Sequence, residues 1–99
     1  MANRRLVLYV VRNGKSENGL GISVSKKVGK SVTRSRVTRL IRESYRLNED
    51  FVPVGYDLVF IARVAARDAT FDQIQEAMRH LLRKQKLWLE EQTPGASPD

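Results

Sequence analysis

The sequence contains no cysteine and a single histidine, and these scarcities exclude several kinds of site. Without cysteine the chain can form neither a disulfide nor a thiolate–metal site. The same absence fits a reducing compartment, and we expect the protein to be cytoplasmic. The histidine, His80, lies in a predicted helix among arginine and lysine residues. We therefore interpret it as a helix-surface residue and not as a catalytic base.

Long hydrophobic runs are also missing. No apolar segment approaches the roughly 18–20 residues that a membrane-spanning helix needs. Two arginines precede the apolar residues 6–11, which resembles the start of a signal peptide, but the run is short and no small-residue cleavage site follows it. We interpret this segment as a β-strand and expect no membrane partner.

Motifs for catalysis by the protein itself are scarce. Residues 29–31, Gly-Lys-Ser, match the end of a phosphate-binding loop, but that motif needs a glycine five positions earlier, where the chain has Val24. Asp57, Asp68 and Asp72 are scattered and form no spaced metal cluster. We therefore expect no catalytic residue, no small-molecule substrate, and no metal or other cofactor bound by the protein alone.

One short segment, by contrast, holds the entire charge excess of the chain. Residues 22–46 contain eight basic residues and one acid, Glu43, so their net charge is 8 − 1 = +7. The rest is balanced, with 18 − 8 = 10 basic and 11 − 1 = 10 acidic residues. Such a concentrated cationic segment is typical of proteins that bind RNA or DNA, and the alternative is a solvated basic helix face without a partner. The basic residues are Lys26, Lys27, Lys30, Arg34, Arg36, Arg39, Arg42 and Arg46.

Three segments have the composition of β-strands. Residues 5–12 are rich in valine and leucine, and residues 19–27 alternate apolar with small residues. These two strands are close enough in the chain to pair as a hairpin. Residues 56–64 form a nearly continuous apolar run, which indicates a central strand.

Two segments have the periodicity of helices. Apolar spacing predicts a helix over residues 31–47, with Ser31 as its N-cap, and a second over residues 71–89, with Thr70 or Asp72 near its cap. On the first helix we expect one apolar face, formed by Val37, Leu40, Ile41, Ser44 and Tyr45. We expect a basic side opposite to it, formed by Arg36, Arg39, Arg42 and Arg46.

The order of these elements is strand, strand, helix, strand, helix. It predicts an α/β (α+β) two-layer sandwich, in which a small mixed sheet has both helices packed on one face. We expect a single domain over residues 1–92. The proline-, glycine- and serine-rich residues 93–99 predict a disordered tail.

The basic segment also has a specific order of residues. Residues 21–32 read Gly-Ile-Ser-Val-Ser-Lys-Lys-Val-Gly-Lys-Ser-Val, and they are followed by Arg34-Ser35-Arg36, Arg39-Leu40-Ile41-Arg42-Glu43 and Tyr45-Arg46. This order and spacing resembles the signature of the bacterial ribonuclease P protein subunit. The strands on either side agree as well, so the resemblance spans roughly residues 3–88.

The resemblance implies a fold like the second domain of ribosomal protein S5. It also implies the function of the family, whose enzyme removes the 5′ leader of precursor tRNA by endonucleolytic hydrolysis. In that enzyme the RNA subunit is the catalyst and requires Mg²⁺, so the expected partners are the catalytic RNA and precursor tRNA. The eight basic residues named above would bind RNA. A cleft between the sheet and the flanking helices would bind the leader, with Tyr9 and Trp88 as its aromatic residues.

Three departures from the family pattern stand out. Ser35 replaces the usual asparagine and Thr38 the usual lysine, which weakens contacts at two positions of the helix. Family members also carry an N-terminal helix before the first strand, and we expect this chain to lack it through truncation or loss.

Other functions remain open from the residues alone. The chain could be a ribosome-associated or general RNA-binding module without a processing role. It could also be a self-sufficient nuclease, or a packaging protein that binds duplex DNA equally well.

Overall fold

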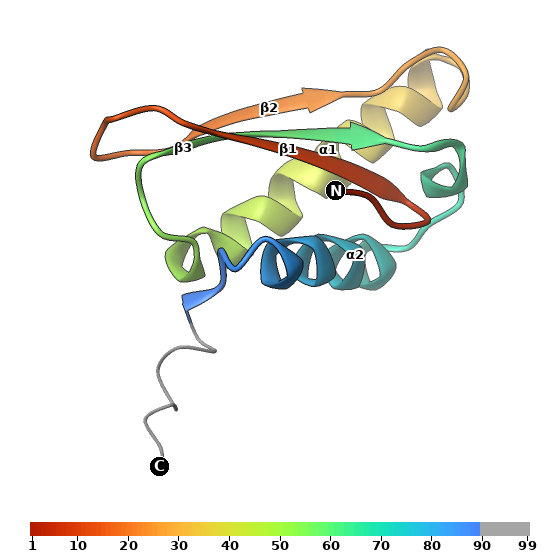
Figure 1. Ribbon diagram of the computed structural model, residues 1–99. Coiled ribbons are helices and arrows are strands. Elements are labelled where there is room, and N and C mark those ends of the chain that lie inside the picture. The colour runs from red at the N-terminus through yellow and green to blue at the C-terminus, as the bar shows by residue number, and fades with distance from the viewer. Residues whose placement is uncertain (90–99) are drawn as a thin grey trace.

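The computed structural model describes residues 1–89, and its elements follow the predicted order. The predicted tail, residues 93–99, and the last three residues of the predicted domain lie outside the described residues. Figure 1 shows a layer of strands lying against two helices. The elements are β1 (Leu6–Arg12), β2 (Gly19–Ser23), α1 (Ser31–Asn48), η1 (Glu49–Phe51), β3 (Tyr56–Ala62), η2 (Val64–Ala66) and α2 (Phe71–Lys84).

The sheet has three strands in the order β1-β3-β2, so β3 occupies the centre as its apolar run predicts. β1 pairs with β3 in antiparallel register, with Leu6 opposite Ala62. β2 pairs with the other side of β3 in parallel register, with Gly19 opposite Asp57. The sheet is therefore mixed, and α1 is the crossover between its two parallel strands.

The predicted hairpin between the first two strands is wrong, because β3 lies between them. The polar connection, residues 13–18, instead bonds to the segment around the start of β3. The Asn13 amide donates to Asp57 Oδ1 at 2.9 Å, and the Tyr56 N–H donates to Asn18 Oδ1 at 2.9 Å. The side chains of this connection thus link both edge strands to the central one.

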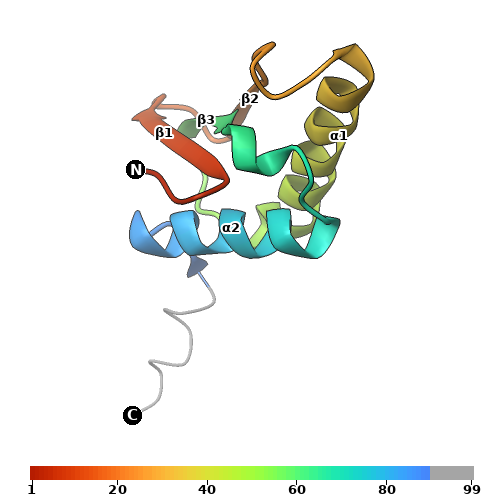
Figure 2. The ribbon, with the colours of Figure 1, turned by 90° about the vertical axis from the view of Figure 1, so that its right-hand side faces the viewer.

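Both helices pack on one face of the sheet, and the core lies between the two layers (Figures 1 and 2). Alternate strand residues point into this core, and each of Leu6, Leu8, Leu58 and Phe60 is fully buried. They meet the apolar faces of the helices, which supply Val37, Ile41, Tyr45, Ile74, Ala77, Met78, Leu81 and Leu82. This confirms the two-layer α+β architecture and the predicted apolar face of the first helix.

β2 ends at Ser23 and not at residue 27, because the chain then turns. The Val28 N–H donates to the Ser25 carbonyl at 3.0 Å, and the Val28 side chain is fully buried. Gly29 follows at a point where a Cβ would lie 3.0 Å from the Cβ of Thr33. Any larger residue would push the connection away from α1, so glycine allows the connection to pass close to the first turn of the helix.

α2 ends at Lys84, earlier than predicted, because Lys86 adopts a left-handed backbone with φ of 60°. The Leu87 N–H then donates back to the Leu82 carbonyl at 2.8 Å, which closes the helix end. The chain turns inward, and Leu87 and Trp88 are both buried. Glycine is the usual residue at such a position, so the lysine gave no signal in the sequence.

A buried polar network joins α1 to α2. Asn48 is fully buried, and its amide donates to the Ser44 carbonyl at 2.8 Å and to Gln75 Oε1 at 3.1 Å. Its own Oδ1 accepts a hydrogen bond from Arg79 Nε at 3.1 Å. The network satisfies the buried amide and fixes how the two helices sit on each other. No described helix is both long and apolar enough to cross a membrane.

Candidate nucleic-acid interface

α1 presents three of the predicted arginines on its outward face. Arg39, Arg42 and Arg46 are all exposed, whereas Val37 and Ile41 on the inward face are fully buried. No carboxylate among residues 1–89 forms an ion pair with these three guanidinium groups. Positions 39 and 46 are two helical turns apart, or about 10 Å. The row can therefore contact more than one phosphate of a bound RNA or DNA backbone.

The start of α1 differs from its prediction. Ser31 is the first helical residue, and the N-cap position belongs to Lys30, whose side chain makes no capping hydrogen bond. The first turn contains no acid. The first N–H groups of a helix carry partial positive charge, and here exposed Lys26 and Lys27 lie on the turn that precedes them. This end of α1 is therefore strongly electropositive.

A groove of about 490 Å³ runs between α1 and the end of β2. Arg34 and Arg42 line it, together with Ser35 and Thr38, the two positions that depart from the family pattern. The Nε atom of Arg34 is buried and has no hydrogen-bond partner among residues 1–89. Short side chains at the two departing positions keep the groove open beside two guanidinium groups, which suits an anionic ligand.

Arg36 lies at the side of α1 that faces the connection between β3 and α2, and not on the outward face as predicted. Its NH2 donates to the Ala69 carbonyl at 2.8 Å, and its NH1 donates to the Arg67 carbonyl at 3.3 Å. It is partly buried. The guanidinium thus holds the β3–α2 connection against α1, a role that residue spacing could not reveal because its acceptors are backbone carbonyls.

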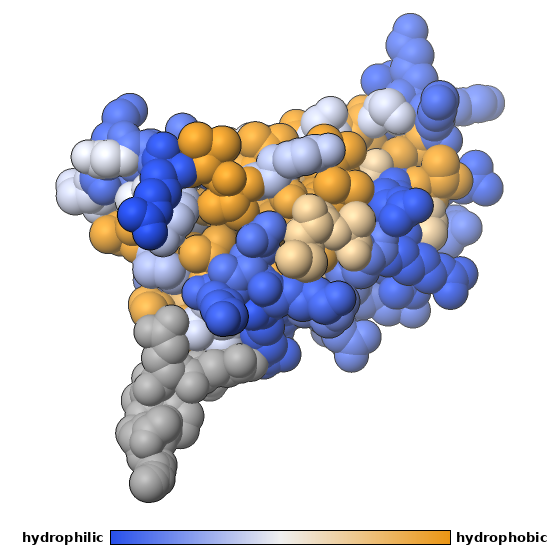
Figure 3. Space-filling view, viewed as in Figure 1, coloured by the Kyte–Doolittle hydropathy of each residue, from blue (hydrophilic) through white to orange (hydrophobic). Residues whose placement is uncertain are grey.

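Tyr9 lies on the open face of the sheet, opposite the helices. It is 57% exposed, and its register partner on the same face is Val59 of β3. Gly21 of β2 is the register partner of Val59 on its other side, so the β2 side of this face has no side chain at that position. Val11 on the same face is 65% exposed. Figure 3 shows hydrophobic side chains gathered over the strands, above the polar surface of the helices.

Trp88 has different surroundings and does not share a site with Tyr9. It is 4% exposed, and its ring packs against Phe51 with centroids 5.1 Å apart. The guanidinium carbons of Arg83 and Arg79 lie 5.3 and 6.0 Å from its centroid. This places the indole in the helix layer, on the other side of the sheet from the open face, where it is already covered by protein.

Groups that could perform acid–base or metal chemistry are not gathered in the described chain. Within residues 1–89 no three His, Cys, Asp or Glu side chains lie close enough to hold a metal ion. His80 is exposed on α2, as predicted. Burial raises the pKa of the Tyr45 phenol above its ordinary 10.0, although the Asn18 side chain partly opposes this. The arrangement is suited to binding a polyanion.

Comparisons with known sequences show which family the chain resembles. A protein-family model described as Ribonuclease P matches residues 1–86. A ribonuclease P protein component of Alkaliphilus oremlandii is 53% identical over 87 residues, which cover 88% of this chain and 76% of the relative. One of Clostridium botulinum (strain Loch Maree / Type A3) is 58% identical over 84 residues, covering 84% of this chain and 76% of the relative.

Solved structures with the same architecture come from the same family. The RNase P protein of Staphylococcus aureus superposes with a TM-score of 0.80 at 38% identity, covering 89% of this chain and 81% of that one. The RNase P protein of Thermotoga maritima gives a TM-score of 0.78 at 31% identity, covering 85% and 80% of the two chains.

Proposed function

Because the chain belongs to the ribonuclease P protein family, we propose that the outward arginines of α1 bind the catalytic RNA of that enzyme. The family forms the protein part of the ribonucleoprotein that processes tRNA 5′ ends, and this chain has that protein-subunit role. An RNA partner follows from the family.

The observation that carries the assignment is the exposed row Arg39, Arg42 and Arg46, beside the electropositive start of α1. Arginine grips phosphate oxygens with two parallel hydrogen bonds, and each neutralised phosphate releases counterions. Lys26, Lys27 and Lys30 extend the row around the helix N-terminus. Arg34 adds a guanidinium at the groove, and Arg36 holds the neighbouring connection in place without needing to contact RNA.

The proposed contact with the substrate, precursor tRNA, is made by Tyr9 on the open face of the sheet. The 5′ leader of precursor tRNA is single-stranded, and unpaired bases stack on exposed aromatic rings. Tyr9 offers such a ring beside Val59 and Val11, on the side of the sheet away from the helices. Trp88 is enclosed by Phe51 and α2, so we assign the leader contact to Tyr9 and give the indole a packing role.

The proposed division of labour leaves the chemistry to the RNA. The RNA subunit would hold the Mg²⁺ that activates water for hydrolysis, and the protein would supply affinity and orientation from its basic helix and its open sheet face. We propose that this happens in the cytoplasm, where precursor tRNA is made. Correct 5′ ends would then depend on the protein through binding and not through a protein active site.

Cleavage of precursor tRNA by a bacterial ribonuclease P RNA at low Mg²⁺ tests the proposed function. RNA alone should be almost inactive there, because few ions are available to screen its phosphates. Addition of the protein should restore cleavage at the correct 5′ position. Cleavage by the protein without RNA, or tight binding to ribosomal RNA with none to the catalytic RNA, would contradict the proposal.

The leader contact is tested with two precursors that differ only in having or lacking a leader. We expect Tyr9→Ala to lower the affinity of the assembled enzyme about fivefold to a hundredfold for the precursor with a leader, the range that stacking on one aromatic ring supports. Affinity for the leaderless RNA should not change. Val54→Ala, an exposed apolar substitution outside the sheet, is the control. Equal losses for both precursors would remove Tyr9 from the leader site.

A further inference from the structure

Four arginines outside the basic segment come together at one end of the molecule. Arg4 and Arg5 precede β1, and Arg63 and Arg67 lie in the connection between β3 and α2, some sixty positions later in the sequence. The Arg63 N–H donates to the Arg5 carbonyl at 2.9 Å, and its guanidinium donates to the Asn3 carbonyl at 2.8 Å. The two segments are therefore bonded side by side. Charge counting along the sequence could not reveal this group.

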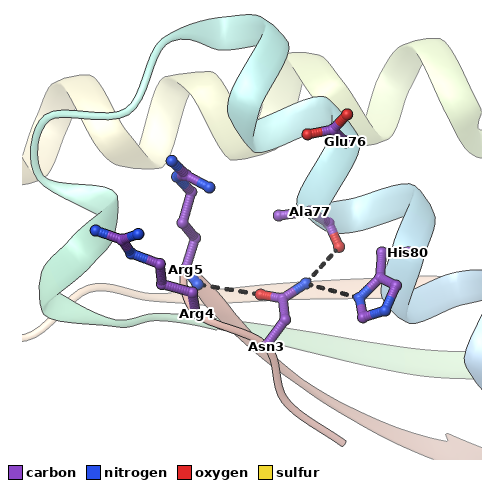
Figure 4. Close-up of a pocket in the computed structure, with 6 residues that line it drawn as sticks. All are labelled: Asn3, Arg4, Arg5, Glu76, Ala77 and His80. Carbon is purple, nitrogen blue, oxygen red and sulfur yellow. Dashed lines mark hydrogen bonds between the residues drawn. The ribbon is translucent and has the colours of Figure 1, made fainter.

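A shallow pocket of about 270 Å³ lies beside this group (Figure 4). Asn3 is one of the residues that line it, and this side chain is held in place because its amide donates to the Ala77 carbonyl at 2.9 Å and its Oδ1 accepts from the Leu6 N–H at 2.9 Å. In Figure 4 the side chains of Arg4 and Arg5 point away from His80. The pocket thus has a fixed Asn3 side chain in its lining and two guanidinium groups at one side.

These arginines are not paired with acidic side chains of the described residues. No carboxylate within residues 1–89 forms an ion pair with any of the four. Glu76 lines the α2 side of the pocket but bonds to neither Arg4 nor Arg5, so an anion is favoured on the side away from it. The Nε atom of Arg5 is buried without a hydrogen-bond partner. A partly buried guanidinium with an unmet donor is stabilised when an anion binds it.

The group is continuous with the basic face of α1. Figure 2 looks at this end of the molecule, and it shows the β3–α2 connection between the start of β1 and the first half of α1. Arg36 joins the connection to α1 through its bonds to the carbonyls of Arg67 and Ala69. An RNA backbone that follows α1 toward its start would therefore next meet Arg67 and Arg63, and then Arg4 and Arg5.

We propose that Arg4, Arg5, Arg63 and Arg67 form a second phosphate-binding surface for the catalytic RNA, with Arg36 as the positioning residue that aligns it with α1. The inference rests on the proposed function of α1, because it extends that RNA surface across the β3–α2 connection. These four arginines, which lie outside residues 22–46, would then supply part of the affinity for the catalytic RNA. The ligand is the phosphodiester backbone, so base identity is not read here.

The test compares two double variants with the same loss of charge. Arg4→Gln/Arg67→Gln removes two exposed guanidinium groups whose side chains make no hydrogen bond within residues 1–89. Arg12→Gln/Lys84→Gln removes two exposed charges elsewhere and is the control. Affinity for the catalytic RNA and for precursor tRNA alone is measured over a salt series, and thermal unfolding verifies that both variants fold.

For the first variant we expect affinity for the catalytic RNA to fall about fivefold to twentyfold near 0.1 M salt, and the slope of log K against log salt to become shallower by about 1.5, as two lost phosphate contacts predict. The control should keep the wild-type slope. Equal behaviour of the two variants would overturn the inference alone, and so would an effect confined to precursor tRNA. If the wild-type protein did not bind the catalytic RNA, the proposed function would fail and this inference with it.

Discussion

α1 and α2 begin in opposite ways, although both pack on the same face of the sheet. Thr70 and Gln73 cap α2 reciprocally, since Thr70 Oγ1 accepts from the Gln73 N–H at 3.2 Å and Gln73 Oε1 accepts from the Thr70 N–H at 3.0 Å. α1 starts after Lys30 with no side-chain cap and no acid in its first turn. At the start of α2 a side chain of the protein accepts a hydrogen bond from a backbone N–H group. At the start of α1 no side chain does so, and the N–H groups there are left to bind a ligand.

The comparison explains how one small domain can be both stable and cationic. A side-chain cap contributes about 1 kcal/mol to the stability of a helix, and α1 lacks this contribution. What holds α1 in place is its inward face, with Val37 and Ile41 in the core and Asn48 in the polar network. Stability therefore comes from one side of this helix, and its start and outward face remain available for RNA.

The largest expected effect comes from reversing charge on the outward face of α1. Arg39→Glu/Arg42→Glu replaces two favourable phosphate contacts by repulsion, and we expect affinity for the catalytic RNA to fall by more than about a hundredfold, or about 3 kcal/mol. Cleavage at low Mg²⁺ should be lost, whereas thermal unfolding should change little because both residues are exposed. Arg12→Glu/Lys84→Glu is the matched control, and an equal loss there would mean that net charge alone matters.

The next effect concerns the point where the two helices meet. Asn48→Ala should lower the free energy of unfolding by about 2–3 kcal/mol, because Arg79 Nε loses its acceptor and Gln75 Oε1 keeps only one of its two donors, the Ser44 hydroxyl. RNA affinity of the folded protein should remain unchanged. Leu47→Ala, at the exposed neighbouring position, should stay within about 0.5 kcal/mol. Denaturant unfolding measures both, and equal values would show that the network is dispensable.

Removing the cap of α2 should have a smaller effect on stability. Thr70→Ala is expected to cost about 1 kcal/mol, because the Gln73 N–H loses its acceptor. The same change at the start of α1, Ser31→Ala, should be neutral within about 0.5 kcal/mol, since Ser31 caps nothing. A loss at Ser31 as large as that at Thr70 would end the contrast between the two helices.

Adding a side-chain cap to α1 should increase the stability of the fold and weaken its binding to RNA. Lys30→Asp places a carboxylate at the N-cap, and we expect it to stabilise the fold by about 0.5–1 kcal/mol while it weakens RNA binding several-fold. Lys30→Gln removes the charge without supplying a good cap, so it should weaken binding and leave stability unchanged. Stronger RNA binding by the aspartate variant would contradict an anion site at the start of α1.

The smallest effect is confined to alkaline pH and concerns the buried side of α1. Burial raises the pKa of Tyr45 above 10.0, so the folded state favours the protonated phenol. This contribution to stability is complete below pH 10 and is lost as the pH rises through the folded-state pKa. As the pH rises above 10, the wild-type protein should therefore lose more stability than Tyr45→Phe does. Parallel stability curves for the two proteins would contradict this.

The sequence predicted those features that depend on local pattern. The continuous apolar run of β3 predicted its central place, and the spacing of Val37, Ile41 and Tyr45 predicted the buried face of α1. The cap at Thr70 also followed from local residue types. The concentration of charge in residues 22–46 predicted the helix that bears the outward arginines.

Features that depend on distant partners were missed. Strand pairing was one, because local composition is as consistent with a hairpin of β1 and β2 as with the observed position of β3 between them. The bonds of Arg36 were another, since their acceptors are carbonyls 31 and 33 positions away. The left-handed backbone of Lys86 gave no signal, because lysine has no preference for it.

The place of β3 in the sheet has a consequence for how the chain folds as it is made. Leu6 pairs with Ala62, 62 − 6 = 56 positions later, and Gly19 pairs with Asp57, 57 − 19 = 38 positions later. During synthesis from the N-terminus, both edge strands must therefore wait unpaired for a shared partner, and such distant pairing slows folding. α1 is synthesised after both edge strands and before β3, so it has no sheet to dock on until β3 emerges. The basic surface should thus be assembled in one late step, which keeps a partly made chain from presenting it in its final geometry.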